Sequence, residues 1–105
     1  MCFGKLCQHW LKYKKPLLKE KQYKSYETNL KPFAVLNNTP VCKLVKSDFQ
    51  QIINDYARRN PNTGKPSSKK TLRDFRLTAR QVFDFAVENR ILEYNPVTYV
   101  QIPKN

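Results

Sequence analysis

Residues 67–89 read Ser67-Ser-Lys-Lys-Thr-Leu-Arg-Asp-Phe-Arg-Leu-Thr-Ala-Arg-Gln-Val-Phe-Asp-Phe-Ala-Val-Glu-Asn89, and their pattern predicts one long amphipathic helix. At about 100° per residue, the apolar side chains fall on one side and the cations on a flank beside it. The apolar side comprises Leu72, Phe75, Ala79, Val82, Phe83 and Ala86. The cationic stripe comprises Lys69, Arg73, Arg76 and Arg80. The helix therefore presents one face to a core and a line of positive charge elsewhere.

The composition predicts a single basic domain. The chain has 105 residues, of which 40% are hydrophobic, and its formal net charge is +12. A chain of this size forms one domain with a modest core. Such an excess of cations attracts nucleic acid or an anionic membrane surface. No apolar run reaches the ~18–20 residues of a membrane span and no signal peptide opens the chain, so we expect a soluble, cytoplasmic protein.

Two further helices are predicted before residue 34. Residues 2–14 place Phe3, Leu6, Trp10 and Tyr13 on one apolar face, and Pro16 ends that helix. Residues 19–33 form the next helix, whose buried side comprises Tyr23, Tyr26, Leu30 and Phe33. A second basic stripe runs along it, formed by Lys21, Lys24, Thr28 and Lys31. The second helix therefore repeats the division into core face and basic face.

The predicted third helix begins with a capping box, in which Ser47 is the N-cap and Gln50 occupies N3. Its apolar face comprises Phe49, Ile52, Ile53, Tyr56 and Ala57, and it ends near Asn60-Pro61. Before it, we expect Val41, Leu44 and Val45 to pack onto the core. After it, residues 62–66 form an exposed, flexible loop, and Ser67 or Ser68 caps the long helix.

The last residues are expected to leave the bundle. Ile91, Leu92 and Tyr94 fold back as an apolar hook, and residues 97–105 begin an extended linker. The sequence therefore predicts an all-α domain over residues 1–96, with four helices whose apolar faces turn inward.

Candidate catalytic and metal-binding residues are few. Cys2, Cys7 and Cys42 with His9 match no usual zinc spacing, so we favour buried or partly exposed thiols over a metal site. Asp48 and Asp55 can share a helix face, but two solvated carboxylates are the simpler interpretation. No nucleophile with its base is recognisable, and we expect neither catalysis nor a cofactor or small-molecule substrate.

The motifs in order resemble the N-terminal core-binding (SAM-like) domain of phage-type integrases, the tyrosine recombinases. The residues that carry the resemblance are Phe3-Gly-Lys-Leu-Cys-Gln-His-Trp10, Lys21-Gln-Tyr-Lys-Ser-Tyr-Glu27, Leu44-Val-Lys-Ser-Asp-Phe-Gln50, Ser67-Ser-Lys-Lys-Thr-Leu-Arg-Asp-Phe-Arg76 and Val82-Phe-Asp-Phe-Ala-Val-Glu-Asn-Arg-Ile-Leu-Glu-Tyr-Asn-Pro-Val97. The resemblance covers essentially the whole chain, and the order and spacing of the motifs make it specific.

The resemblance implies a DNA-binding fragment of a phage, prophage or mobile-element integrase. This domain would form half of a clamp around the core recombination site, with helices two and four facing double-stranded DNA. It also implies contacts with other protomers in a tetrameric synapse. The catalytic residues of such recombinases belong to a second domain beyond the linker, and their Arg…His-x-x-Arg…Tyr pattern is absent from this chain, where Lys12 stands three positions after His9.

The predicted DNA contacts follow from the two stripes. We expect Lys69 and Lys70, with Ser68 and Thr71, to meet phosphates at a helix N-terminus. We expect Arg73, Arg76 and Arg80 to reach the major groove, with phosphate contacts from Lys21, Lys24, Thr28 and Lys31. The alternative for Arg76 is packing of its stem on the apolar face. Two alternatives remain for the domain: a helical protein-interaction module, and a small independent DNA-binding regulator.

Overall fold

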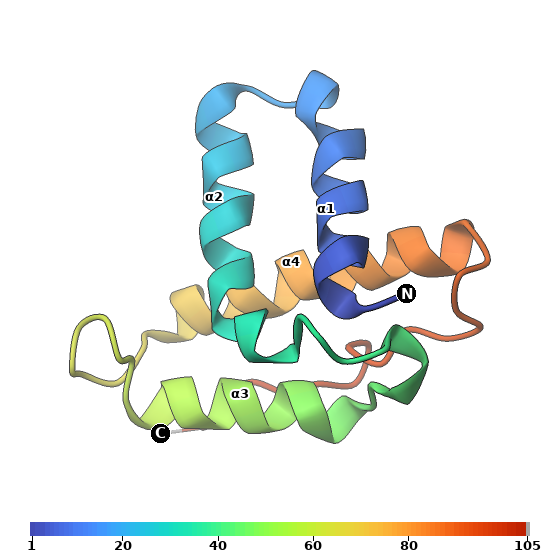
Figure 1. Cartoon of the computed structure of the whole chain (residues 1–105). Helices are drawn as coiled ribbons and strands as arrows, with labels where there is room; N and C mark the ends of the chain where they lie inside the picture. The colour runs from blue at the N-terminus through green and yellow to red at the C-terminus, as the bar shows by residue number, and fades with distance from the viewer. Residues whose placement is uncertain (105) are drawn as a thin grey trace.

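The computed structural model describes residues 1–104 as an all-α fold in two crossed layers (Figure 1). Helices α1 (Phe3–Lys14) and α2 (Glu20–Leu30) form an antiparallel pair. Helices α3 (Lys46–Arg58) and α4 (Lys69–Glu88) lie crosswise beneath this pair. Three short 3-10 helices connect them: η1 (Lys15–Leu17), η2 (Lys31–Leu36) and η3 (Val41–Lys43). The predicted four-helix, all-α fold is confirmed.

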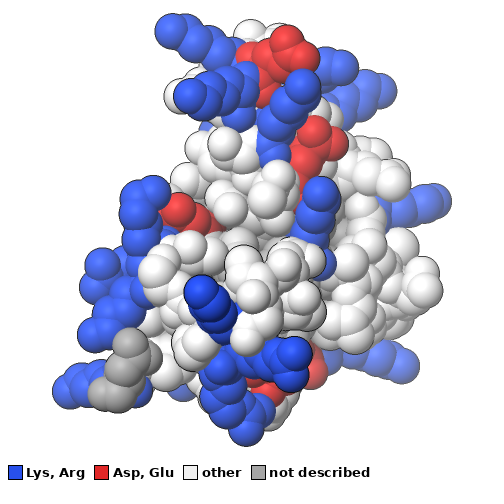
Figure 2. Space-filling view, turned by 90° about the vertical axis from the view of Figure 1, so that its left-hand side faces the viewer, with Lys and Arg blue, Asp and Glu red and all other residues white. Residues whose placement is uncertain are grey.

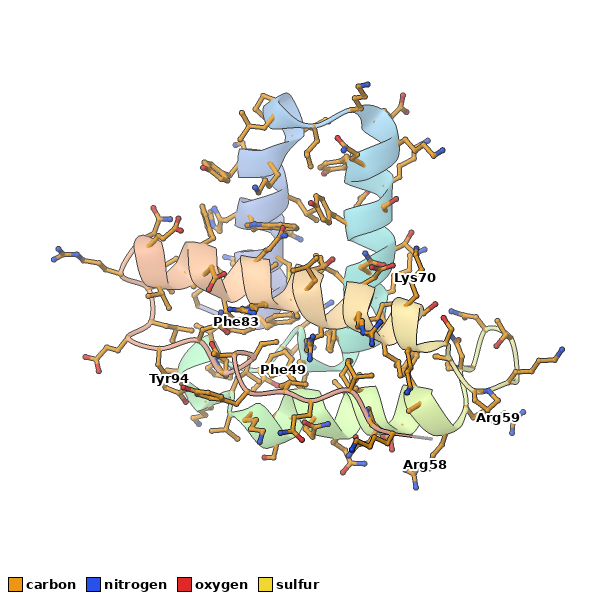
Figure 3. The ribbon with its side chains drawn as sticks, turned by 180° about the vertical axis from the view of Figure 1, so that it is seen from behind. Phe49, Arg58, Arg59, Lys70, Phe83 and Tyr94 are labelled. Atoms are coloured by element: carbon orange, nitrogen blue, oxygen red, sulfur yellow. The ribbon has the colours of Figure 1, made fainter. Side chains whose placement is uncertain are left out.

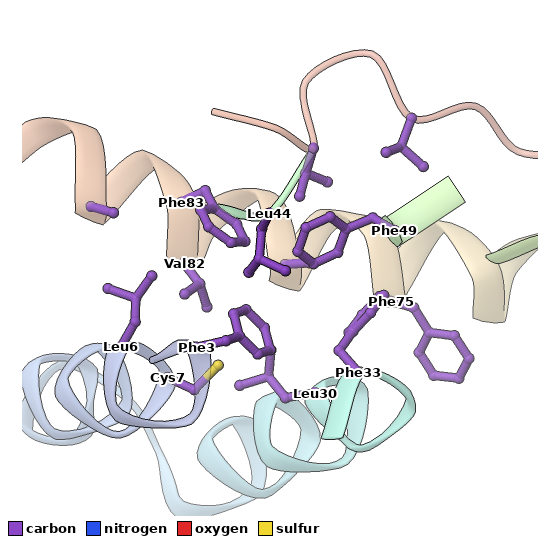
Figure 4. Packing of buried hydrophobic residues seen from close by; sticks show 14 of the residues in the cluster. Phe3, Leu6, Cys7, Leu30, Phe33, Leu44, Phe49, Phe75, Val82 and Phe83 are labelled. Carbon is purple, nitrogen blue, oxygen red and sulfur yellow. The ribbon is translucent and has the colours of Figure 1, made fainter. Parts of the chain in front are cut away.

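Four phenylalanines from four different elements form the centre of the core (Figure 4). The ring centroid of Phe49 lies 5.9 Å from that of Phe3, 5.6 Å from that of Phe33 and 5.2 Å from that of Phe83. Phe3 and Phe83 stack at 5.7 Å. Aromatic pairs at such separations contribute about 0.5–1.5 kcal/mol each beyond the burial of their surface. Phe49 of α3 therefore joins both layers.

The apolar faces of α4 and α1 largely match the predicted ones. All six residues assigned to the core face of the long helix are buried, and so are Phe3, Leu6 and Trp10 of α1. Tyr13 differs, because 53% of it is exposed. Its ring packs against Phe85 at a centroid distance of 5.2 Å. The core face of α1 therefore ends at Trp10.

Helix α2 is shorter than predicted. Its α-helical part ends at Leu30, and the chain continues as the 3-10 helix η2. Pro32 lacks a backbone N–H and cannot extend the α-helical hydrogen-bond pattern, which explains the change. Phe33 is still buried, as predicted, whereas Tyr23 and Tyr26 are half-buried.

Helix α3 begins at Lys46, so the prediction of Ser47 as its N-cap is wrong. The N-cap is Val45, whose N–H donates to the Asp48 carboxylate at 2.9 Å. A charge-assisted bond in the first turn also suits the helix dipole. Val45 itself is 46% exposed, in contrast to the expected packing, while Val41 and Leu44 are buried as expected.

The segment between α3 and α4 is organised by Asn60, which is buried. The Asn60 N–H donates to the Lys65 carbonyl at 2.7 Å, and its side-chain oxygen accepts the Asn62 N–H at 2.9 Å. Gly64 has a φ of 71°, a left-handed conformation that glycine adopts without strain. Residues 62–66, predicted to form an exposed, flexible loop, are exposed and form a hydrogen-bonded turn before Ser68.

The C-terminal segment packs against the bundle through residue 104 and is not an extended strand of linker. Val97 and Val100 are buried in the core cluster. The Gln101 N–H donates to the Gln50 side-chain oxygen at 2.8 Å, and the Gln50 amide donates back to the Gln101 carbonyl at 2.8 Å. Residues 97–104 therefore continue the domain predicted to close at residue 96, because apolar side chains at 97 and 100 find space between α3 and α4.

Candidate nucleic-acid interface

The predicted basic residues of α2 are all exposed. Lys21, Lys24 and Thr28 follow one another along α2, and Lys31 is the first residue of η2. Lys24 forms an ion pair with Glu20, whose carboxylate lies 3.4 Å from the Lys24 ammonium. Both side chains are largely exposed, at 70% and 83%, and such surface pairs contribute little. The α2 cations thus remain free to meet another anion.

A hollow of about 370 Å³ lies between α2 and α4. Its lining comprises Lys21, Lys24, Ser25, Thr28, Asn29 and Asp74. A second hollow of about 350 Å³ continues along the same side, and its lining includes Thr28, Lys31, Thr71 and Asp74. Since Thr28 and Asp74 line both, the two hollows form one depression, which we call the α2–α4 depression. Five of the predicted contact residues border it.

The first turn of α4 is fixed by Ser68. Its hydroxyl oxygen accepts the Thr71 N–H at 3.2 Å, and the hydroxyl also donates to the Thr71 hydroxyl at 3.0 Å. The Ser68 and Thr71 side chains, which were predicted to contact DNA, therefore bond to each other at the N-terminus of α4. Lys69 and Lys70 are exposed in this turn, where the positive end of the helix dipole favours an anion. Figure 3 shows Lys70 at the end of α4 that lies beside α2.

The outer face of α4 carries five exposed residues at spacings of three, four, three and four. They are Lys70, Arg73, Leu77, Arg80 and Asp84, and we call them the α4 ridge. Arg73 and Arg80 are in no ion pair within residues 1–104. Leu77 is 51% exposed between them.

Arg76 is set apart from the exposed arginines. It is half-buried, and its Nη1 donates to the Val100 carbonyl at 3.2 Å. The guanidinium thereby holds the C-terminal segment against α4, a contact that neither of the two predicted roles of Arg76 included. The predicted stripe placed Arg76 between Arg73 and Arg80. In the structure the exposed residue between them is Leu77.

Most cations of the described residues form no ion pair. The chain has 20 Lys and Arg residues, and three ion pairs occur among the described residues: Lys24–Glu20, Arg58–Asp55 and Lys70–Asp74. Each pair joins residues one helical turn apart, and pairs of that kind contribute about 0.2–0.5 kcal/mol. Figure 2 faces the side that carries α2 and shows lysine and arginine side chains projecting around a largely uncharged centre.

The groups considered for metal binding or catalysis lie apart. Burial raises the pKa of the Cys7 thiol to about 12, so this thiol stays protonated, whereas Cys42 and His9 are exposed. No cluster of three or more metal-ligating side chains occurs within residues 1–104. Asp48 accepts the Val45 N–H, and Asp55 accepts the Gln51 amide.

No helix in the described part of the chain is long and apolar enough to cross a membrane.

Sequence reasoning missed two features of this face. Leu77 lies off the apolar face of α4, and helical periodicity assigns no role to a single apolar residue there. Its position between Arg73 and Arg80 is nevertheless evident in the sequence. Asn29 was also missed: its amide donates to the Thr78 hydroxyl at 3.1 Å and joins α2 to α4. No local signal indicates a contact between residues 49 positions apart.

Comparisons with known proteins give one strong similarity. No protein-family model matches the chain, and none of the curated proteins does. Among solved structures, the chain is similar to a protein fragment, residues 61–160, from Clostridium leptum, determined by solution NMR. The two share 31% sequence identity over 98% of this chain and 89% of that one, with a TM-score of 0.83. The fragment bears no functional name, so the likeness extends to fold and family alone.

Proposed function

The chain belongs to the same family as the Clostridium leptum fragment, and we propose that it serves as the DNA-gripping core-binding domain of a tyrosine recombinase. In that role it would form half of a clamp around the core recombination site of a phage, prophage or mobile-element integrase. The domain itself would be non-catalytic, and the reacting residues would belong to a domain outside residues 1–105.

The observation that carries the proposal is the α2–α4 depression. Lys21 and Lys24 border it from α2 and Lys31 from the start of η2, and the first turn of α4 contributes Thr71, next in sequence to the exposed Lys69 and Lys70. Three lysines thus border one depression, in which Asp74, paired with Lys70, is the acid of the lining, and Lys21 and Lys31 form no ion pair among the described residues. A DNA backbone supplies the regularly spaced negative charges that such a surface attracts.

Phosphate contacts would supply most of the affinity and little of the specificity. Sequence selectivity would come from the α4 ridge, where Arg73 and Arg80 are exposed and can donate two bonds to a guanine edge. Arg76 contributes less in this account, because its guanidinium already bonds to the Val100 carbonyl.

A protein-interaction module is the second candidate, and exposed apolar side chains at the far end of the α1–α2 pair favour it. Tyr13 is 53% exposed and Leu17 is 64% exposed. In a recombinase this end would contact other protomers of a tetrameric synapse. A protein-interaction module that does not bind DNA, however, would not explain the exposed cations of α2 and α4.

The test is fluorescence anisotropy of a labelled duplex of about 30 base pairs, three helical turns, titrated with the chain. If about six phosphates are neutralised, affinity falls roughly 10³-fold between about 50 and 200 mM salt. A duplex that does not bind even at the lower salt concentration contradicts the proposal and favours the protein-interaction module.

A further inference from the structure

Leu77 is an apolar residue at the centre of the α4 ridge, and no core contact explains it. It is 51% exposed, and its neighbours along the ridge are the exposed Arg73 and Arg80. Single exposed leucines are ordinary on protein surfaces. This one stands between the two arginines that the proposed function directs at DNA.

The dimensions of the ridge fit a major groove. Arg73 and Arg80 are separated by seven residues, and seven rises of ~1.5 Å place them about 10 Å apart along the helix. The major groove of B-DNA is about 12 Å wide. If α4 crosses the groove, the two arginines lie toward its two walls and Leu77 faces its floor.

We propose that Leu77 contacts the 5-methyl group of a thymine on the floor of the major groove and makes that position selective for thymine. This inference rests on the proposed DNA-binding function and adds a base preference to it. The thymine methyl is the apolar group that base edges display in the major groove.

The chemistry of the other bases supports the selectivity. Guanine and adenine present acceptors at this edge, and cytosine and adenine present an amino donor; thymine presents one acceptor, O4, and beside it the 5-methyl group. A leucine pressed against such groups would displace their water without replacing the hydrogen bonds, which is unfavourable. Thymine alone offers Leu77 a surface that gains from losing its water.

The experiment begins with duplexes of about 30 base pairs that have a random centre, selected for binding to the wild-type chain. In the most enriched duplex, each thymine is then replaced singly by deoxyuridine, which removes the 5-methyl group and keeps the base pair. Burial of one methyl group corresponds to about a three- to fourfold change in affinity. We expect a loss of this size at one thymine for the wild-type chain.

The same series is measured with Leu77→Ala and with Val35→Ala, a control at an apolar residue of η2 that is 76% exposed. Leu77→Ala should bind the thymine and deoxyuridine forms equally, and Val35→Ala should retain the discrimination. If duplexes are enriched but no deoxyuridine effect depends on Leu77, the inference is overturned and the DNA-binding proposal stands. If no duplex binds, both fail.

Discussion

The side-chain amide of Asn29 in α2 donates to the hydroxyl of Thr78 in α4 across 3.1 Å, at a point where Thr78 is only 1% exposed. This bond joins the two helices that enclose the α2–α4 depression. Thr78→Val keeps the shape of the side chain and removes the acceptor. We expect the free energy of unfolding to fall by about 1 kcal/mol, the usual contribution of one such bond, in urea denaturation.

The matching variant Asn29→Ala supplies the control for that bond. If the bond is the reason for the loss, the double variant should be less destabilised than the sum of the two single variants. Losses that simply add would show that the two side chains act independently.

Gly4 allows the start of α1 to approach the segment before η3. The Gly4 N–H donates to the Asn37 carbonyl at 3.0 Å, and a Cβ added at Gly4 would lie 3.1 Å from the Asn37 Cβ. Gly4→Ala should therefore destabilise the fold by about 1–3 kcal/mol, although alanine favours helices more than glycine does. Thermal unfolding measures this. A variant at least as stable as the wild type would show that the segment yields without loss.

Arg90 ends α4 in a left-handed conformation, with a φ of 57°. The Ile91 N–H donates to the Ala86 carbonyl at 2.8 Å and the Arg90 N–H to the Val87 carbonyl at 3.1 Å, which is the Schellman pattern. Arg90→Gly should stabilise the chain by about 1 kcal/mol, because a Cβ is unfavourable there. Arg90→Ala, which keeps a Cβ, should bring no gain. Equal stabilities for the glycine and alanine variants would exclude strain at this position.

The Cys7 thiol gives the fold a dependence on alkaline pH. Burial raises its pKa from 9.0 to about 12, so the folded state holds the proton more tightly than the unfolded state does. Its stabilisation is fully present below pH 9.0 and is lost as the pH rises toward 12. The free energy of unfolding should therefore fall more steeply with pH in the wild type than in Cys7→Ala. Parallel curves would contradict the assignment to this thiol.

Local periodicity predicted the helices and most of the core, because burial of an apolar face requires a spacing that the sequence displays. Ser68 and the six core residues of α4 follow from residues 67–89 alone. The third helix shows where such reasoning stops. Ser47 and Gln50 fit a capping box, but the N-cap is Val45, whose N–H donates to Asp48, and the Gln50 amide is bonded to Gln101, 51 residues away.

The sequence predicted which helices carry the candidate interface, but it predicted less well which residues of α4 are exposed there. The basic residues of α2 lie where their spacing placed them, because that helix has one face free. On α4 the free face depends on where the C-terminal segment packs. Val100 occupies the flank beside Arg76, and the outward row consequently runs through Leu77. No pattern within α4 carries that information.

The most direct test of the account compares two charge reversals of equal size in the anisotropy titration at low salt. Arg73→Glu with Arg80→Glu reverses the α4 ridge, and Lys5→Glu with Lys12→Glu reverses two exposed cations of α1. Circular dichroism checks that both variants remain folded. The account predicts that the first variant loses DNA binding by at least about a hundredfold, because two base contacts of about 1–3 kcal/mol each are lost and negative charge faces the DNA, while the second stays within about tenfold of the wild type. Equal losses in both variants, or binding that survives reversal of the ridge, would contradict the assignment of DNA to α2 and α4.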